Sequence, residues 1–278
     1  SSSGGTGNNN ISIGCNALSE KLTTACQNIA IGAAAGLCID TGNANINIGY
    51  LAGCHNHNAL CNIAMGWNAG KMNGTGDHNV YLGTYAGKGS TSGTPATDNT
   101  GSYNLAIGHN TGYEITTGES NVLMGRSSGV CLTTASGNVF IGYSAGNKAT
   151  TQSNNVFIGD KAGTYRNGGG RNIALGYYAL HGGDTSTTTN NSGYYNIAFG
   201  ALAGKNVTSG SYNILFGRQA GCVIADGSGN IAMGCNSLKG AVSASANIVL
   251  GPNAANKIGA GNCNVFIGKD AGESSGTA

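Results

Sequence analysis

Proline and charged residues are both scarce in this chain of 278 residues. It has 2 Pro and no strict Gly-X-Y period, which excludes a collagen triple helix. Charged residues make up 9 % and the formal net charge is +2, so no basic surface of the kind that binds nucleic acid or anionic lipid is expected. No apolar run approaches the roughly 18 residues of a transmembrane helix. We therefore expect no nucleic-acid partner and no membrane insertion.

Two widespread catalytic motifs are also missing. The chain has 5 His and scattered acidic residues, with no Walker loop and no His-Glu-x-x-His motif. Glycine is abundant, at 50 residues, but it recurs periodically, which indicates a structural role. These features predict a protein that is not an enzyme and that has no cofactor.

A pentapeptide, Asn-[Ile/Val/Leu]-x-[Ile/Leu/Met/Phe]-Gly, recurs through the whole chain, mostly at the spacing that separates Asn28 from Asn45. Its fifteen copies begin at Asn10, Asn28, Asn45, Asn62, Asn79, Asn104, Asn121, Asn138, Asn155, Asn172, Asn196, Asn213, Asn230, Asn247 and Asn264. Five residues of alternation between glycines are too short for a helical period and predict one short strand per copy. Stacking such copies gives an all-β fold, a single β-solenoid of about fifteen 17-residue coils.

Two steps, from Asn79 to Asn104 and from Asn172 to Asn196, are longer than the others and divide the fifteen coils into three blocks of five. We predict one continuous solenoid over residues 1–278, with blocks 10–87, 104–180 and 196–272. The segments between the blocks and at the ends are rich in Ser, Thr and Gly. We expect those around 89–95 and 184–190 to be surface loops.

The alternation within each strand predicts which side chains enter the core. Positions 2 and 4 of the pentapeptide, such as Ile11 and Ile13 or Val139 and Ile141, are always apolar and are expected to face inward. Position 3 is then expected to face outward. It holds bulky apolar groups in several copies, which predicts either a lateral partner or packing under the chain's own loops. This stripe includes Tyr81, Phe140, Phe157 and Phe266.

The fifteen Asn residues are expected to form a ladder in which each amide bonds to the next coil. Satisfaction of the backbone at a turn is the simpler interpretation, and a binding row is the alternative.

The two ends of the chain are expected to join. No capping helix, Pro or Lys cluster protects either end, and uncapped sheet edges favour open polymerisation. If a second copy followed the first head to tail, the step from Asn264 to its Asn10 would have as many residues as the internal step from Asn172 to Asn196. The predicted assembly interface consists of Asn10, Ile11, Ile13, Asn264, Val265 and Ile267. Separate subunits, or a segment of a longer polypeptide, both fit this arithmetic.

Nine Cys are present, five of them in the first four coils. Cys38 and Cys54 lie at nearly equivalent positions of neighbouring coils, so a disulfide between them is a possibility, the alternative being small buried thiols. The cluster of Cys54, His55, His57 and Cys61 has the residue types that bind zinc, but its spacing fits no standard finger. We therefore predict no metal and keep these four residues as weak candidates.

The phrase Asn-Ile-Ala-[Ile/Phe]-Gly-x-x-Ala-Gly, at Asn28–Gly36 and Asn196–Gly204, resembles repeats of phage tail-fibre proteins. It is similar, more loosely because the repeat there is shorter, to the heads of trimeric autotransporter adhesins. The resemblance spans about residues 10–272 and implies a rigid rod, extracellular or on a virion surface, without catalytic residues.

The function expected from these observations is that of a structural subunit of an extracellular fibre, polymerising head to tail with itself. One alternative is an adhesive rod or tail-fibre segment that binds a receptor or glycan through exposed aromatics such as Tyr50, Trp67, Tyr143 and Tyr177. The other is an ice-binding solenoid, suggested by Thr pairs in register at Thr116, Thr133 and Thr150.

Overall fold

The computed structural model describes residues 7–19, 23–89, 99–183, 191–240, 243–259 and 261–272. These residues contain fifteen strands and no helix, and the chain folds as a β-solenoid built on the predicted 17-residue coil. None of the described segments is a helix long and apolar enough to cross a membrane. The predicted loops fall mostly on residues 90–98 and 184–190, which lie outside the described residues.

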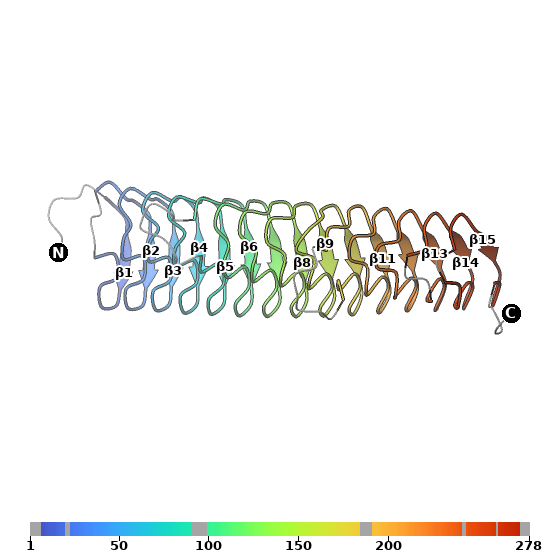
Figure 1. Ribbon diagram of the computed structural model, residues 1–278. Helices are drawn as coiled ribbons and strands as arrows, with labels where there is room; N and C mark the ends of the chain where they lie inside the picture. Colours follow the sequence, from blue (N-terminus) through green and yellow to red (C-terminus); the bar gives the residue numbers. More distant parts are fainter. Residues whose placement is uncertain are drawn as a thin grey trace. The chain divides into compact units, whose positions relative to one another are not determined.

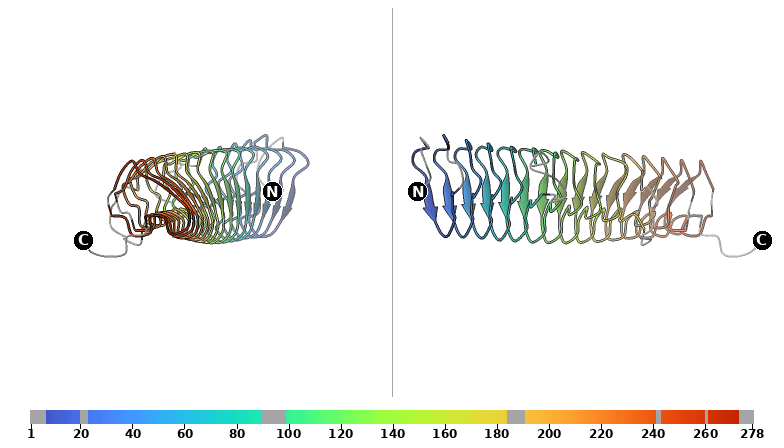
Figure 2. Two further views of the ribbon diagram at one scale, coloured as in Figure 1. Left: turned by 90° about the vertical axis from the view of Figure 1, so that its right-hand side faces the viewer. Right: turned by 60° about the vertical axis from the view of Figure 1, so that its left-hand side comes forward.

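The chain divides into two compact units, Ser1–Asn138 and Val139–Ala278, which we describe separately. The N-terminal unit contains β1 (Ile11–Ile13), β2 (Ile29–Ile31), β3 (Ile46–Ile48), β4 (Ile63–Met65), β5 (Val80–Leu82), β6 (Leu105–Ile107) and β7 (Val122–Met124). Each strand pairs in parallel with the next one, in register, so equivalent residues of successive coils lie side by side (Figures 1 and 2).

The C-terminal unit repeats this arrangement. It contains β8 (Val139–Ile141), β9 (Val156–Ile158), β10 (Ile173–Leu175), β11 (Ile197–Phe199), β12 (Ile214–Phe216), β13 (Ile231–Met233), β14 (Ile248–Leu250) and β15 (Val265–Ile267). These strands are also parallel and in register with their sequence neighbours. The register holds across the long step from Asn172 to Asn196, because Ile173 pairs with Ile197.

The glycine that ends each strand is required by its backbone. In all fifteen copies this glycine has φ between 118° and 139°, a region that side chains with a Cβ avoid. The next coil also leaves no space there: a Cβ on Gly159 would lie 2.5 Å from the carbonyl oxygen of Gly176. The backbone therefore turns sharply while the successive coils remain in contact.

The middle residue of each strand, at position 3, points into the coil. Ala30, Tyr81, Leu123, Phe140 and Phe157 are at most 1 % exposed. The expectation that positions 2 and 4 face inward is therefore wrong, and so is the outward stripe. Of its four residues, Tyr81, Phe140 and Phe157 are buried, and Phe266, in the last strand, is half-buried.

Two positions share the narrow interior of a coil, and in some coils a large side chain at one accompanies a small side chain at the other. Position 12 of the repeat, counted from the Asn of the pentapeptide, is buried together with position 3. Phe140 and Ala149 are buried in one coil, and Ala106 and Ile115 are buried in another. Glycine at position 9 provides further space, since a Cβ on Gly146 would lie 2.5 Å from the Phe140 ring. The small residue at position 8, such as Ala35, is also buried. Other coils are filled differently, since Leu215 and Ile224 are both buried in one of them, so the combination of side chains that fills the core changes from coil to coil.

Aliphatic side chains at positions 2 and 4 form two columns on the outer face of the strands. In strands such as β3 and β9 they are half-buried, because each side chain packs against its equivalents in the coils on either side. The β-branched residues are therefore favoured here by strand geometry and stacking, although the core lies on the other side.

The asparagine ladder is confirmed and satisfies the backbone. In an interior coil the backbone N–H of Asn45 donates to Asn28 Oδ1 at 2.9 Å, and Asn45 Nδ2 donates to Asn28 Oδ1 at 3.1 Å and to the Ala59 carbonyl at 2.7 Å. The same pattern recurs at Asn213 in the C-terminal unit. Both side chains are 0 % exposed, so these amides are unavailable to a ligand.

A buried arginine occupies position 12 in the coil of β9. Arg166 is 1 % exposed, and its guanidinium donates to the carbonyls of Val207 at 2.9 Å, Thr208 at 3.3 Å and Gly193 at 2.5 Å. Burial lowers the pKa of this side chain to about 10. The carbonyls come from the two following coils, so Arg166 links three coils of the C-terminal unit.

Candidate functional site

The two outermost strands are much more exposed than the others. Ile11 and Ile13 of β1 are 49 % and 58 % exposed, and Val265 and Ile267 of β15 are 63 % and 68 % exposed. Strand β1 pairs only with β2, and β15 pairs only with β14, among the residues that the structure describes. The predicted interface residues therefore lie on two open sheet edges.

The backbone groups on these two edges are complementary. Within the stack, the N–H at position 2 donates to the following coil's Asn carbonyl, as Ile248 does to Asn264 at 2.9 Å. The glycine N–H that follows a strand donates backward, as Gly268 does to Leu250 at 2.8 Å. By the same rule Val265 N–H and the Ile267 carbonyl face away from β14. At the other end, the Asn10 carbonyl and Gly14 N–H face away from β2.

The asparagine ladder ends at the same two surfaces. Asn10 Oδ1 accepts from the backbone N–H of Asn28 at 2.9 Å, and Asn264 donates its own N–H to Asn247 Oδ1 at 2.9 Å. An interior Asn such as Asn45 donates its N–H to the preceding Asn and accepts an N–H from the following one. Asn10 shows the accepting half of this pattern, and Asn264 shows the donating half. Asn264 Oδ1 is the acceptor that a following Asn would use, and Asn10 N–H is the matching donor.

The last strand glycine shows open space where interior copies show contact. A Cβ on Gly251 would lie 2.4 Å from the Gly268 carbonyl oxygen, whereas a Cβ on Gly268 would meet nothing within 4 Å among the described residues. The face of β15 that points away from β14 thus has the shape and the polar groups with which an interior coil meets the following coil.

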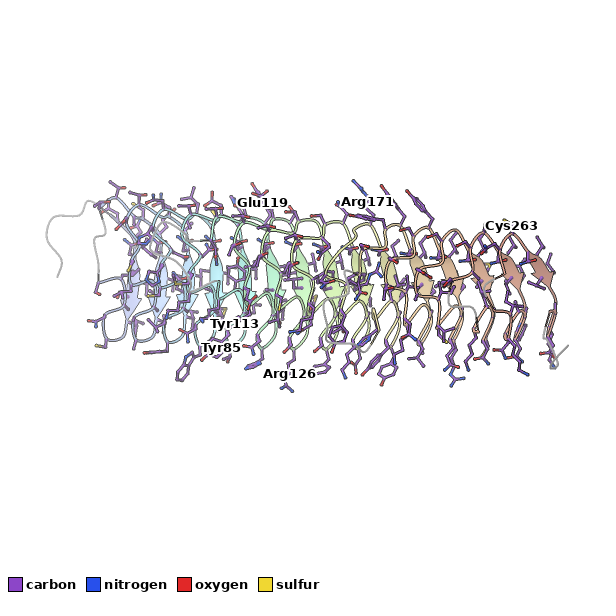
Figure 3. All side chains as sticks on the ribbon, viewed as in Figure 1. Tyr85, Tyr113, Glu119, Arg126, Arg171 and Cys263 are labelled. Atoms are coloured by element: carbon purple, nitrogen blue, oxygen red, sulfur yellow. The ribbon has the colours of Figure 1, made fainter. Side chains whose placement is uncertain are left out.

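Aromatic side chains project from the coil corners. In the N-terminal unit Tyr85 and Tyr113 point outward at one edge and Glu119 at the opposite edge (Figure 3). The predicted aromatics Tyr50 and Trp67 are 48 % and 54 % exposed and meet edge to face, with ring centroids 5.1 Å apart. Tyr143 and Tyr177 of the C-terminal unit are exposed as well.

A tyrosine pair in the C-terminal unit adjoins a polar hollow. Tyr195 and Tyr212 stack with centroids 5.1 Å apart, and the Arg171 guanidinium lies 5.5 Å from the Tyr195 ring. Arg171 and Tyr194 also line a hollow of about 370 Å³, together with Gln152 and other polar residues. This surface offers rings and hydrogen-bonding groups to a polar ligand.

All nine cysteines are present as thiols, so the Cys38–Cys54 disulfide stays a prediction. The ligand atoms of Cys38, Cys54 and His55 lie within 4.8 Å of one another. Two of the weak metal candidates therefore lie beside Cys38, which the sequence indicates only as a disulfide partner. His57 instead lies 3.5 Å from Asp40, and the exposed Cys61 lies just before β4, outside the cluster.

The thiol of Cys54 is acidified by its neighbours. Its hydrogen bond with Cys38 is the main cause that lowers the pKa, and His55 and Lys71 act in the same direction, although burial opposes them. Cys54 therefore has more thiolate character than an ordinary cysteine.

In two coils the residues that begin at the strand-ending glycine read Gly-x-Ser-x-Gly, at Gly125–Gly129 and Gly142–Gly146. Ser127 and Ser144 have φ of 59° and 54°, like the nucleophile elbow of hydrolases. The same position has a positive φ in coils that carry Ala34 or Lys161 there, so the conformation belongs to the solenoid turn. These serines therefore provide no argument for catalysis.

No known protein family, no curated protein sequence and no solved structure matches this chain.

Proposed function

We propose that this protein is a structural, non-enzymatic subunit of an extracellular fibre, and that copies join head to tail by pairing β15 of one with β1 of the next. The observation that carries the proposal is the complementarity of the two open edges. Four backbone groups and both halves of an asparagine pair stand at the positions that interior coils use.

The junction follows from the internal register. Val265 N–H would donate to the next copy's Asn10 carbonyl, and that copy's Gly14 N–H would donate to the Ile267 carbonyl. Ile267 would stack on Ile13 of the next copy, covering side chains that are 68 % and 58 % exposed in the single chain. Fifteen coils at a strand spacing of about 4.8 Å give an expected axial repeat of roughly 70 Å.

The variant Val265→Pro tests this junction. Proline removes the N–H that faces away from β14, while the bonds between β15 and β14 use other groups, so the fold should remain. Electron micrographs and light scattering should show fibres for the unchanged chain and for the control Val265→Thr, and none for Val265→Pro. A monodisperse monomer of the unchanged chain at all concentrations would overturn the proposal.

A mixing experiment sharpens the test. Val265→Pro retains an intact β1 edge, so it should add to a growing fibre and then block the next addition. Mean fibre length should therefore fall as its mole fraction rises. Fibres of unchanged length would show that these edges are not the junction.

An adhesive rod is the second candidate, favoured by the exposed Tyr195–Tyr212 stack beside the polar hollow. Sugar rings stack on aromatic faces while their hydroxyls bond to polar groups. A glycan array should then show signals that the double variant Tyr195→Ala/Tyr212→Ala loses. Ice binding has less support, because the Thr116 hydroxyl donates to the Thr133 carbonyl at 3.1 Å within the stack.

A further inference from the structure

Cys38 and His55 occupy the same position in two successive coils of the N-terminal unit. The backbone N–H of Cys38 donates to the Cys54 carbonyl at 2.8 Å, and that of His55 donates to the Lys71 carbonyl at 2.9 Å. The in-register pairing of β2 with β3 therefore brings Cys38 beside both Cys54 and His55. Their three ligand atoms lie within 4.8 Å of one another.

We propose that Cys38, Cys54 and His55 form a binding site for a thiophilic d¹⁰ metal ion, with Zn²⁺ as the reference ion, that links the second and third coils. Two sulfur ligands and one imidazole are a donor set that zinc uses, with a further position left for water. Tetrahedral bonds of about 2.0–2.3 Å place ligand atoms roughly 3.5–3.8 Å apart. Small side-chain rotations from the observed separations reach this geometry.

The surroundings favour a bound cation in two ways. His55 Nδ1 lies 3.3 Å from the Lys71 carbonyl oxygen. An Nδ1–H that donates there leaves the lone pair on Nε2, and such a second bond commonly orients a metal-ligating imidazole. Cys54 is buried and Cys38 and His55 are half-buried, so two coils enclose the donors without closing access to them.

His57 is excluded from the ligand set by its own contact. Its ring lies 6.1 Å from that of His55, measured between centroids, and its Nδ1 lies 3.5 Å from Asp40. Among the exposed thiols of the same unit, Cys61 lies outside the cluster and offers a matched control.

Titration of the reduced, chelator-treated protein with Co²⁺, a spectroscopic substitute for Zn²⁺, tests the site. One equivalent should produce thiolate-to-cobalt charge transfer and the intense visible bands of a tetrahedral site, and Zn²⁺ should abolish both. Each of Cys38→Ser, Cys54→Ser and His55→Gln should weaken binding at least tenfold, whereas Cys61→Ser should bind as the unchanged protein does.

Thermal melting provides a second readout that does not depend on colour. Zn²⁺ should raise the melting temperature of the unchanged protein and of Cys61→Ser, and should leave that of Cys54→Ser unchanged. Metal binding that survives all three cluster substitutions would overturn the proposal. A Cys38–Cys54 disulfide in peptide maps of the purified protein would do so as well, because it consumes both sulfur ligands.

Discussion

The interior and terminal coils have the same sequence pattern but different surroundings. In the C-terminal unit, Leu215 of β12 is 0 % exposed, whereas Phe266, at the same position of β15, is half-buried although its side chain is larger. In the N-terminal unit every residue of β1 is exposed, whereas the middle residues of β2 to β7 are buried. A coil thus encloses little by itself, and its neighbours on both sides complete its core, as in other solenoids.

The largest effect should separate the inner and outer faces of one strand. Phe157→Asp places a carboxylate in the coil interior beside Phe140, with which the ring stacks at 5.0 Å, and should cost more than about 4 kcal/mol. Ile158→Asp changes a half-buried outer column and should cost about 1–2 kcal/mol. Urea unfolding followed by circular dichroism measures both. Equal losses would contradict the assignment of position 3 as the inner one.

A glycine pair compares an interior coil with the last one. Gly159→Ala forces a Cβ to within 2.5 Å of the Gly176 carbonyl in addition to the strain of φ 134°, and should cost about 3 kcal/mol or more. Gly268→Ala has the strain of φ 120° but no neighbour within 4 Å among the residues that the structure describes, and should cost about 1–2 kcal/mol. If β15 pairs with another copy, Gly268→Ala should also suppress fibre formation, because the next coil's Gly14 would meet the new Cβ.

The asparagine ladder gives the smallest contrast. Asn213→Ala removes the acceptor of the Asn230 N–H at 3.0 Å and the donor to the Gly227 carbonyl at 2.9 Å, and should cost about 2–3 kcal/mol. Asn264→Ala, at the ladder's end, should cost about 1 kcal/mol in the single chain. Chemical denaturation of the dilute protein measures this difference. A loss at Asn264 as large as that at Asn213 would contradict the incomplete bonding of the last rung.

The strand positions could be predicted from the repeat because each pentapeptide combines a turn-forming glycine with alternating apolar residues. The inner face could not. Positions 2 and 4 are always apolar whereas position 3 varies, so the pattern favoured positions 2 and 4 as the inner ones. Alternation alone does not distinguish a packed core from a column of side chains stacked on the outer face. Positions 3 and 12 vary from coil to coil and share one interior, as Phe140 with Ala149 and Ala106 with Ile115 show, and this pairing is visible only when the coil is closed.

The candidate sites divide in the same way. The period predicted that Asn10 and Asn264 carry the first and last rungs of the described ladder, because copies of a repeat keep their order in the stack. The Cys38–Cys54–His55 cluster could be predicted only in part from the sequence. Spacing suggested that Cys38 lies near Cys54, but the hydrogen bonds between coils decided that His55, and not Cys61, joins them.

The amino-acid sequence by itself determined the period, the all-β class, the strand positions and the asparagine ladder, since each of these depends on residues within one repeat or at a constant spacing. Only the tertiary structure decided which face is buried, which thiols meet and which backbone groups are left at the edges. These features depend on the direction in which the backbone turns at the glycine that ends each strand, where φ is 132° at Gly49 and 134° at Gly159, and on contacts between coils that local alternation does not encode.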